Sequence, residues 1–195
     1  MERQKNKIEY TLIRSARRSI GVEIAPDGAV IVRAPLRTPL RRIEALLREK
    51  ADWIARARAR ANARTEAAAA AGPLTPEELK ELKTQARAYL PGRVAYFAER
   101  LGVSCGRITV RCQKTRWGSC NAQGDLSFNC LLMLTPPEAV DSVVAHELCH
   151  RKHMDHSAAF YAELLRVFPE YPKWRAWLKE HGPVLLARAR AADNE

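Results

Sequence analysis

The chain has 195 residues, of which 47% are hydrophobic, and a formal net charge of +11 at pH 7. This length and composition fit one globular domain with at most a small appended piece, and they exclude a chain too polar to bury a core. The longest apolar runs are too short to span a bilayer, so we expect no membrane partner.

The N-terminal residues predict a small sheet. The first seven residues lack the apolar segment of a signal peptide, which indicates a cytoplasmic protein. Residues 8–13 are typical of a strand, and residues 19–25 and 29–34 alternate around the turn residues Pro26-Asp27-Gly28. That arrangement predicts a β-hairpin with one buried side.

A helix should follow the hairpin and lead to a linker. Thr38 is its expected N-cap, and apolar residues repeat at helical spacing as far as Ile54. We therefore define residues 1–64 as an N-terminal β-hairpin and helix region. Residues 65–74 are Ala-rich and include Gly72-Pro73, so we expect a helical or mobile linker there.

The next segment predicts a long helix and a pair of strands. Thr75 and Glu78 form a capping box, and Gly102 should end the helix, which Pro91 can kink. Residues 108–114 and 126–134 read as two strands of an antiparallel hairpin. We expect the strand at 126–134 to lie beside an extended peptide substrate, since strand addition holds a peptide backbone.

His146-Glu147-Leu148-Cys149-His150 has the form H-E-x-x-H. We expect Thr135 and Glu138 to form a capping box at the start of the helix that carries it. Positions i and i+4 share one helical face, so His146 and His150 can reach one metal ion. Glu147 is placed to take a proton from a water that the metal activates.

A third ligand is needed for a catalytic zinc site. His156 can supply it if the helix ends near Met154-Asp155 and the chain turns back. His153 would stay on the same helical face and is expected outside the ligand set, while Glu163 and Glu170 are the alternatives. Mn²⁺ or Ni²⁺ could use the same ligands.

After Ser157, two further helical segments separated by prolines should complete a core that covers residues 75–186. A polar tail, residues 187–195, should follow. The five cysteines form an odd set without C-x-x-C spacing, so free thiols in a reducing cytoplasm are the simplest account.

Four stretches together resemble the YgjP-like metallopeptidase family, which is related to the SprT and WLM metalloproteases. They are Arg116-Trp-Gly-Ser-Cys120, Gly124-x-Leu-x-x-Asn129, His146-Glu-Leu-Cys-His150 and His156-Ser-x-x-Phe160. The resemblance implies an α+β fold with a zincin-like core, in which a small antiparallel sheet packs on an active-site helix.

The resemblance also implies a zinc-dependent hydrolase with one Zn²⁺ per chain. His146, His150 and His156 would be its ligands, with Glu147 as catalytic base, and the substrate would be a peptide or protein. Arg116, Ser119 and Asn129 come from the resembling motifs and are candidates for substrate or transition-state contacts.

Other function classes stay open. Because the family has also been credited with nucleoside triphosphate pyrophosphatase activity, a UTP-type nucleotide is the alternative substrate. Residues 1–72 carry a net charge of +8 and residues 136–195 a net charge of −1. The basic N-terminal region could therefore bind nucleic acid, as in a SprT- or WLM-like protease, or be a solvated arginine-rich surface. A purely structural metal would have no use for Glu147, and the oligomeric state stays open.

Overall fold

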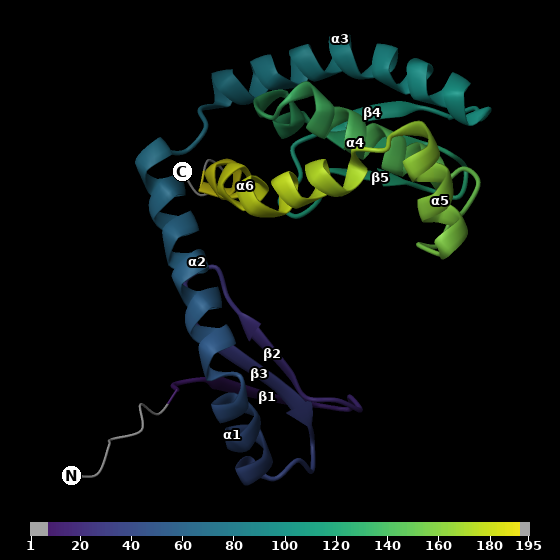
Figure 1. Ribbon diagram of the computed structural model, residues 1–195. Helices are drawn as coiled ribbons and strands as arrows, with labels where there is room; N and C mark the ends of the chain where they lie inside the picture. Colours follow the sequence, from purple (N-terminus) through teal and green to yellow (C-terminus); the bar gives the residue numbers. More distant parts are fainter. Residues whose placement is uncertain (1–7, 192–195) are drawn as a thin grey trace. The chain divides into compact units, whose positions relative to one another are not determined.

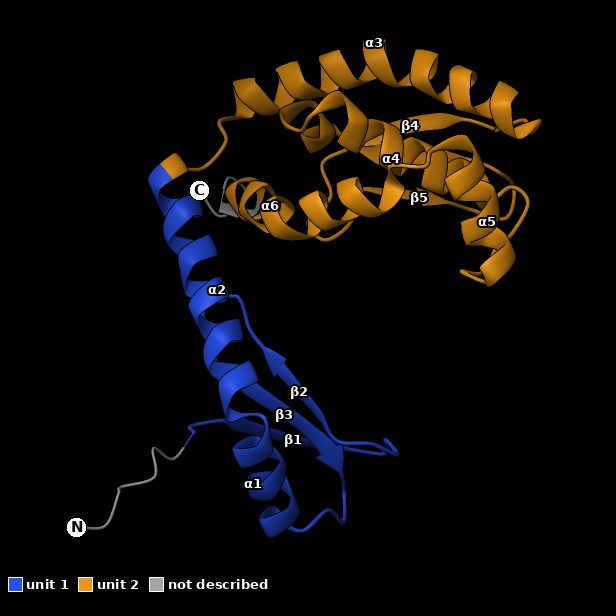
Figure 2. Cartoon of the chain, viewed as in Figure 1, with its two compact units in different colours: residues 1–70 blue, residues 71–195 orange. Residues whose placement is uncertain are grey.

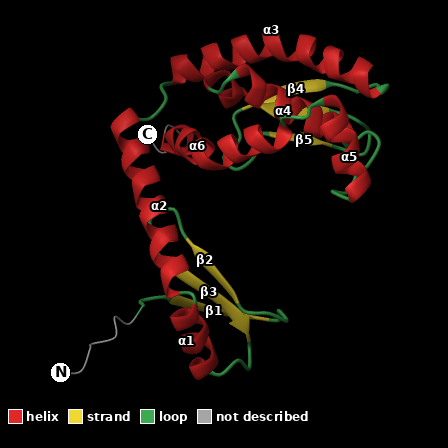
Figure 3. Cartoon of the chain, viewed as in Figure 1, coloured by secondary structure: helices red, strands yellow, loops and turns green. Residues whose placement is uncertain are grey.

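The structure is a computed structural model that describes residues 8–191, and these fold as an α+β protein with two small mixed sheets (Figures 1 and 3). The chain divides into two compact units, residues 1–70 and residues 71–195 (Figure 2). Within the described residues, no helix combines the length and the apolar character needed to cross a membrane. The strands are β1 (Thr11–Ser15), β2 (Gly21–Ile24), β3 (Val30–Pro35), β4 (Ile108–Arg111), β5 (Gly118–Cys120) and β6 (Leu126–Asn129). The helices are α1 (Leu40–Glu49), α2 (Ala51–Ala71), α3 (Pro76–Leu101), the 3₁₀ helix η1 (Cys130–Leu134), α4 (Pro137–Cys149), α5 (Ala158–Val167) and α6 (Tyr171–Ala191).

The first unit contains the expected hairpin. β2 and β3 pair antiparallel, and Gly28, with a φ of 82°, closes the turn between them. β1 adds to the other edge of β3 in parallel, which gives the strand order β1-β3-β2. One face of β3 packs against Ile43 and Leu47 of α1 and Ile54 of α2, so alternation in the strand and helical spacing in the helices build one small core.

Two expectations for the helices of this unit are wrong. Thr38 does not cap α1: the N-cap is Pro39, which makes no side-chain bond, and the Thr38 amide closes a turn onto Pro35. The helix also breaks at Lys50 before α2 begins. The Ala-rich residues 65–71 belong to α2. Of the two forms expected for this part of the linker, helical or mobile, the structure has the helical one.

Hydrogen bonds join residues 72–74 to the segment that we expected to be a polar tail. Gly72 ends α2 with a φ of 71°, and its carbonyl accepts a hydrogen bond of 2.8 Å from Arg188 Nε. Leu74 is buried in the core of the second unit. We expected a tail from residue 187, but α6 continues to Ala191 because Leu186 and Ala189 are buried in that core. Residues 192–195 of the expected tail lie outside the described residues.

The long helix α3 follows its sequence signals. Thr75 and Glu78 form both bonds of the capping box, and Gly102 ends the helix in the left-handed conformation. Pro91 does not interrupt it, since α3 is assigned as one helix across that position. Arg93 of α3 binds Asp141 of α4 through two bonds of 2.6 and 2.8 Å, and both side chains are more than two-thirds buried. This ion pair joins α3 to the helix that carries the H-E-x-x-H motif.

Asp141→Asn should destabilise the fold by about 1–3 kcal/mol, because it leaves the largely buried Arg93 side chain without its charged partner. Chemical denaturation measures the change. Glu170→Gln is the matched control, since Glu170 binds Lys173 in an exposed pair whose loss should cost less than about 1 kcal/mol. Equal stability of the two variants would show that the α3–α4 ion pair contributes nothing.

The second sheet differs from the expected antiparallel hairpin. The strand order is β4-β6-β5, with β4 and β6 parallel and β5 and β6 antiparallel. Residues 126–134 are not one strand, because the Asn129 side chain accepts a hydrogen bond from the Leu131 amide and turns the chain into η1. β6 is thus the central strand with both edges paired, so it cannot pair with a substrate. β4 and β5 are the two edge strands, and β5 lies beside α4.

The expected capping box of α4 is also wrong. Thr135 Oγ1 donates to Leu132 O at 2.7 Å and closes η1, and α4 begins after Pro136 without a side-chain cap. Two consecutive prolines start this helix instead, since neither needs an amide partner. Ser157 caps α5 by accepting a hydrogen bond from the Phe160 amide.

Candidate active site

Three histidines converge at the C-terminal end of α4. His146 lies in the last turn of the helix, His150 is its C-cap residue, and His156 comes from the loop before α5. One ring nitrogen of each lies within 4.8 Å of the others, and the Nε2 atoms of His146 and His156 are 3.1 Å apart. Ligand nitrogens in a tetrahedral zinc site are about 3.3 Å apart, so these residues fit a metal ion of that kind.

The other ring nitrogens are held by the protein. His150 Nδ1 donates to the His153 carbonyl at 3.0 Å, because a carbonyl can only accept. The Tyr171 hydroxyl lies 3.0 Å from His146 Nδ1. Both bonds leave Nε2 available, which is the usual arrangement around metal-binding histidines. His153 thus takes part through its backbone carbonyl, and its side chain is not one of the three converging imidazoles.

Burial keeps two of these rings neutral. It lowers the pKa of His146 to about 4, with smaller contributions from the charges of His150 and His156. Burial also lowers the pKa of His150, against an opposing bond to His153. Neutral imidazole is the form that binds a metal ion, so His146 and His150 are ready to bind at neutral pH.

Glu147 is buried beside the histidines, with 7% of its surface exposed. Burial raises the pKa of its carboxyl group to about 7, and the charge of Arg116 and the amide of Cys120 oppose this. A carboxylate with a pKa near neutrality can take up a proton and release it again at the same pH. The arrangement is therefore suited to general acid–base chemistry next to a metal ion.

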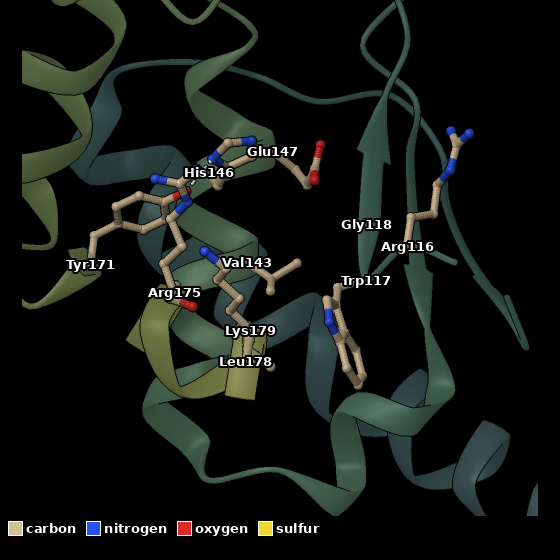
Figure 4. Close-up of a pocket in the computed structure, with 11 residues that line it drawn as sticks. Arg116, Trp117, Gly118, Val143, His146, Glu147, Tyr171, Arg175, Leu178 and Lys179 are labelled. Carbon is tan, nitrogen blue, oxygen red and sulfur yellow. Dashed lines mark hydrogen bonds between the residues drawn. The ribbon is translucent and has the colours of Figure 1, made fainter. Parts of the chain in front are cut away.

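A cavity of about 340 Å³ opens beside His146 and Glu147 (Figure 4). β5 and the residues before it form one wall, with Trp117 and Gly118, and the first half of α6 forms the opposite wall. Tyr171 and Arg175 of α6 lie next to His146, while Trp117 faces them from the strand side (Figure 4). The residues that line the cavity are Arg116, Trp117, Gly118, Ser142, Val143, His146, Glu147, Tyr171, Arg175, Leu178 and Lys179.

A family model for the YgjP-like metallopeptidase domain matches residues 18–81 and 77–181. The chain belongs to this family. No curated protein matches the chain. Among solved structures, the metallopeptidase zymogen abylysin of Pyrococcus abyssi is similar over 46% of this chain and 91% of its own, with 21% identity and a TM-score of 0.41.

Membership in the YgjP-like metallopeptidase family makes the chain a metal-dependent hydrolase of the peptidase class, with a peptide or protein as substrate. A metal cofactor belongs to that chemistry. Among the described residues, His146, His150 and His156 form the group of histidine, cysteine and acidic side chains that could hold an ion.

The three other candidate residues take different places in this YgjP-like domain. Arg116 lines the cavity, but its side chain is directed away from His146 (Figure 4). Ser119 lies on β5 and does not line the cavity. Asn129 is fully buried: its amide nitrogen donates to the carbonyls of Gln113 and Arg116, and its oxygen accepts from the Leu131 amide. Through these bonds Asn129 holds the backbone that leads into β5. Its buried side chain has no group left to contact a substrate.

The alternative third ligands lie in ion pairs. Glu163 binds Lys152 and Arg166, and these two bonds lower its pKa to about 2. Glu170 binds Lys173 at 3.1 Å. Neither carboxylate belongs to the histidine group, so the geometry favours His156 over both.

Gly118 leaves room for Glu147. A Cβ atom at Gly118 would lie 2.8 Å from both Cγ and Oε1 of Glu147. Cβ atoms in proteins essentially never come this close to another heavy atom. Gly118→Ala should therefore displace the carboxylate and lower kcat about 100-fold or more while metal content is unchanged. Peptide cleavage rates and elemental analysis measure both quantities.

Gly92→Ala is the matched control for that substitution. Gly92 lies in α3 with nothing within 4 Å of its added Cβ, so kcat should not change and stability should hold or rise. A Gly118→Ala enzyme as active as the Gly92→Ala enzyme would show that Glu147 tolerates the displacement.

Proposed function

We propose that this chain is a zinc peptidase of the zincin type. In this proposal His146, His150 and His156 hold one Zn²⁺ per chain and Glu147 is the catalytic base. The observation that carries the proposal is the position of the buried Glu147 carboxylate, next in sequence to His146, beside three converging ring nitrogens and an open cavity. A purely structural metal site would have no use for a carboxylate with a raised pKa.

When bound, a zinc ion supplies Lewis acidity and lowers the pKa of water. Glu147 then takes the proton of the attacking water and returns it to the leaving amine as the peptide bond breaks. The edge strand β5 replaces residues 126–134 as the strand we propose for pairing with extended substrate, because its outer edge is unpaired in the sheet and it borders the cavity.

Metal content tests the ligand set. Elemental analysis of zinc-loaded wild type should give one zinc per chain, and His150→Ala and His156→Ala should each lose most of it, since a three-ligand site cannot keep its affinity with two. Glu163→Gln is the control: it changes the alternative carboxylate and should keep its zinc. Zinc retained by His156→Ala and lost by Glu163→Gln would move the third ligand to Glu163.

A nucleotide pyrophosphatase is the second candidate. The observation in its favour is the lining of the cavity on the side of α6 and of Trp117, where Arg175 and Lys179 accompany this aromatic side chain. Cations and an aromatic ring could bind the phosphates and base of a nucleoside triphosphate. Release of pyrophosphate from UTP, abolished by Glu147→Gln, would favour this activity over peptide cleavage.

A further inference from the structure

The cavity beside Glu147 has an apolar end. Three apolar side chains line it from separate places in the chain: Trp117 just before β5, Val143 in α4 and Leu178 in α6. Val143 precedes His146 by three residues, so the two side chains share one face of α4. In Figure 4, Val143 and Leu178 lie below His146, and the ring of Trp117 faces them from the side of the strand.

Trp117 is held in place from two sides. Its carbonyl accepts a hydrogen bond of 2.8 Å from the Asn129 amide, which fixes the Trp117 backbone to β6. A Cβ atom on Gly182 of α6 would lie 2.7 Å from Cζ2 and 3.2 Å from Nε1 of the indole. The ring therefore lies directly against the backbone of α6, in space that a larger residue would fill. Trp117 thus spans the cavity from the strand wall to the helix wall.

The floor of this end belongs to the hydrophobic core. Val143 and Leu178 are part of the buried core of the second unit, and only 7% and 8% of their surfaces are exposed. Ser142 also lines the cavity, but its hydroxyl donates to the Ala139 carbonyl at 2.7 Å within α4. Water beside Val143 and Leu178 would find few hydrogen-bond partners, whereas an apolar group there would leave water and contact apolar surface.

The apolar end lies within reach of the residue next to a bond under attack at Glu147. Val143 is three residues from His146, which is about 4.5 Å of helix, and consecutive Cα atoms of a peptide are about 3.8 Å apart. A peptide whose scissile carbonyl lies beside Glu147 can therefore bring a neighbouring side chain over Val143. The cavity measures about 340 Å³. Ligand pockets measure roughly 300–1,000 Å³, so one large side chain and the adjoining backbone would fill this one.

We propose that Trp117, Val143 and Leu178 form an apolar subsite for the side chain of a residue beside the scissile bond, so that the enzyme prefers peptides with a large aliphatic or aromatic residue there. This inference rests on the proposed peptidase function. Burial of that side chain would position the scissile carbonyl at Glu147, so the preference should be visible in kcat/KM.

Cleavage of a peptide set tests the preference. The peptides share an Ala/Gly sequence with both ends blocked, and each carries one Leu, Phe, Gln or Glu at a scanned position. At the position that reaches the subsite, kcat/KM for Leu should exceed that for Gln by about tenfold or more, because the polar amide of a side chain of similar size must leave water. Equal rates for Leu and Gln at every position, or the highest rate for Glu, would overturn the inference.

Opposite changes at Val143 test its place in the subsite. Val143→Ala enlarges the space and should raise the Phe-to-Leu ratio of kcat/KM about threefold or more, whereas Val143→Leu should lower that ratio as much. The ratio is independent of the amount of folded enzyme, so a loss of stability alone does not change it. Val144→Ala is the matched control, since Val144 is buried in the same helix but does not line the cavity. Unchanged ratios in both Val143 variants would overturn the inference.

Gly182→Ala tests the place of Trp117. The added Cβ should displace the indole from α6 and lower the Leu-to-Gln ratio about threefold or more. Gly92→Ala, with nothing near its added Cβ, is the control within a helix and should keep the wild-type ratio. The same ratio in both variants would overturn the assignment of Trp117 to the subsite.

Peptide binding separates failure of this inference from failure of the proposed function. Fluorescence anisotropy with labelled Phe and Gln peptides on the Glu147→Gln protein needs no turnover. Tighter binding of the Phe peptide, reduced by an added Val143→Leu substitution, supports the apolar subsite even if wild type cleaves no peptide. Equal binding of both peptides would overturn the subsite, and cleavage by wild type without a preference would do so while leaving the peptidase function in place.

Discussion

Glu147→Gln should abolish hydrolysis while leaving the fold and the metal site intact. Glutamine has nearly the same shape as glutamate but cannot take the proton of the attacking water, so kcat should fall by about 10²–10⁴-fold or more. His146 and His150 flank the substituted position and stay unchanged, so zinc content should remain at one per chain. Cleavage assays and elemental analysis on the same preparations measure both.

The substitution should not weaken the fold. Burial raises the folded-state pKa of Glu147 above its unfolded value, so an ionised carboxylate is disfavoured in the folded, metal-free protein as the pH rises above about 5. Glutamine removes that cost, and the unfolding midpoint of the metal-free variant at neutral pH should equal or exceed that of wild type. A loss of activity accompanied by unfolding would leave the role of Glu147 as a base unsupported.

Glu138→Gln provides the matched change on the same helix. Glu138 lies exposed in the first turn of α4, far along the helix from the histidines, and its loss should cost at most about 1 kcal/mol through the helix dipole. Its kcat should stay at the wild-type value. Residual cleavage by Glu147→Gln at the rate of Glu138→Gln would contradict the proposed mechanism.

The parts that the sequence predicted well depend on short-range geometry. The i, i+4 spacing of His146 and His150 fixes a shared face wherever the helix forms, and the six-residue step to His156 allows the chain to turn back. Thr75 with Glu78 and Gly102 with its left-handed φ are local signals, and the structure has both. The hairpin around Gly28 is another, because its turn residues and the flanking alternation lie within a few residues.

The parts that the sequence missed depend on contacts between distant segments. Nothing near Arg175 or Tyr171 in sequence indicates that α6 returns to the motif helix, so neither was a candidate site residue. The pairing of β5 with β6 was hidden because Gly118–Cys120 is short and reads as a turn. Thr135 looked like a helix cap, yet the preceding apolar residues form η1, and the hydroxyl bonds there instead.

Asn129 was visible in the sequence as part of a motif, but its role depends on contacts with residues distant in sequence. Its substitution should have the second of the two largest effects. Its motif marked it as a candidate substrate contact, whereas its side chain makes three internal hydrogen bonds and has no exposed surface. Asn129→Ala removes these bonds and takes a donor from the part-buried contacts to the carbonyls of Gln113 and Arg116. At about 1–3 kcal/mol for each unsatisfied group, the variant should lose about 3–5 kcal/mol of stability in chemical denaturation.

Activity should fall with stability because the same bonds hold the residues that lead into β5, whose Gly118 touches Glu147. Asn121→Ala is the matched control: Asn121 bonds to Asp125 in an exposed turn, so its loss should cost less than about 1 kcal/mol and leave kcat unchanged. Elemental analysis should find zinc in both variants, since neither asparagine contacts a histidine ligand. If Asn129→Ala were as stable as Asn121→Ala but inactive, Asn129 would act on the substrate directly, and the positioning role derived from its hydrogen bonds would be wrong.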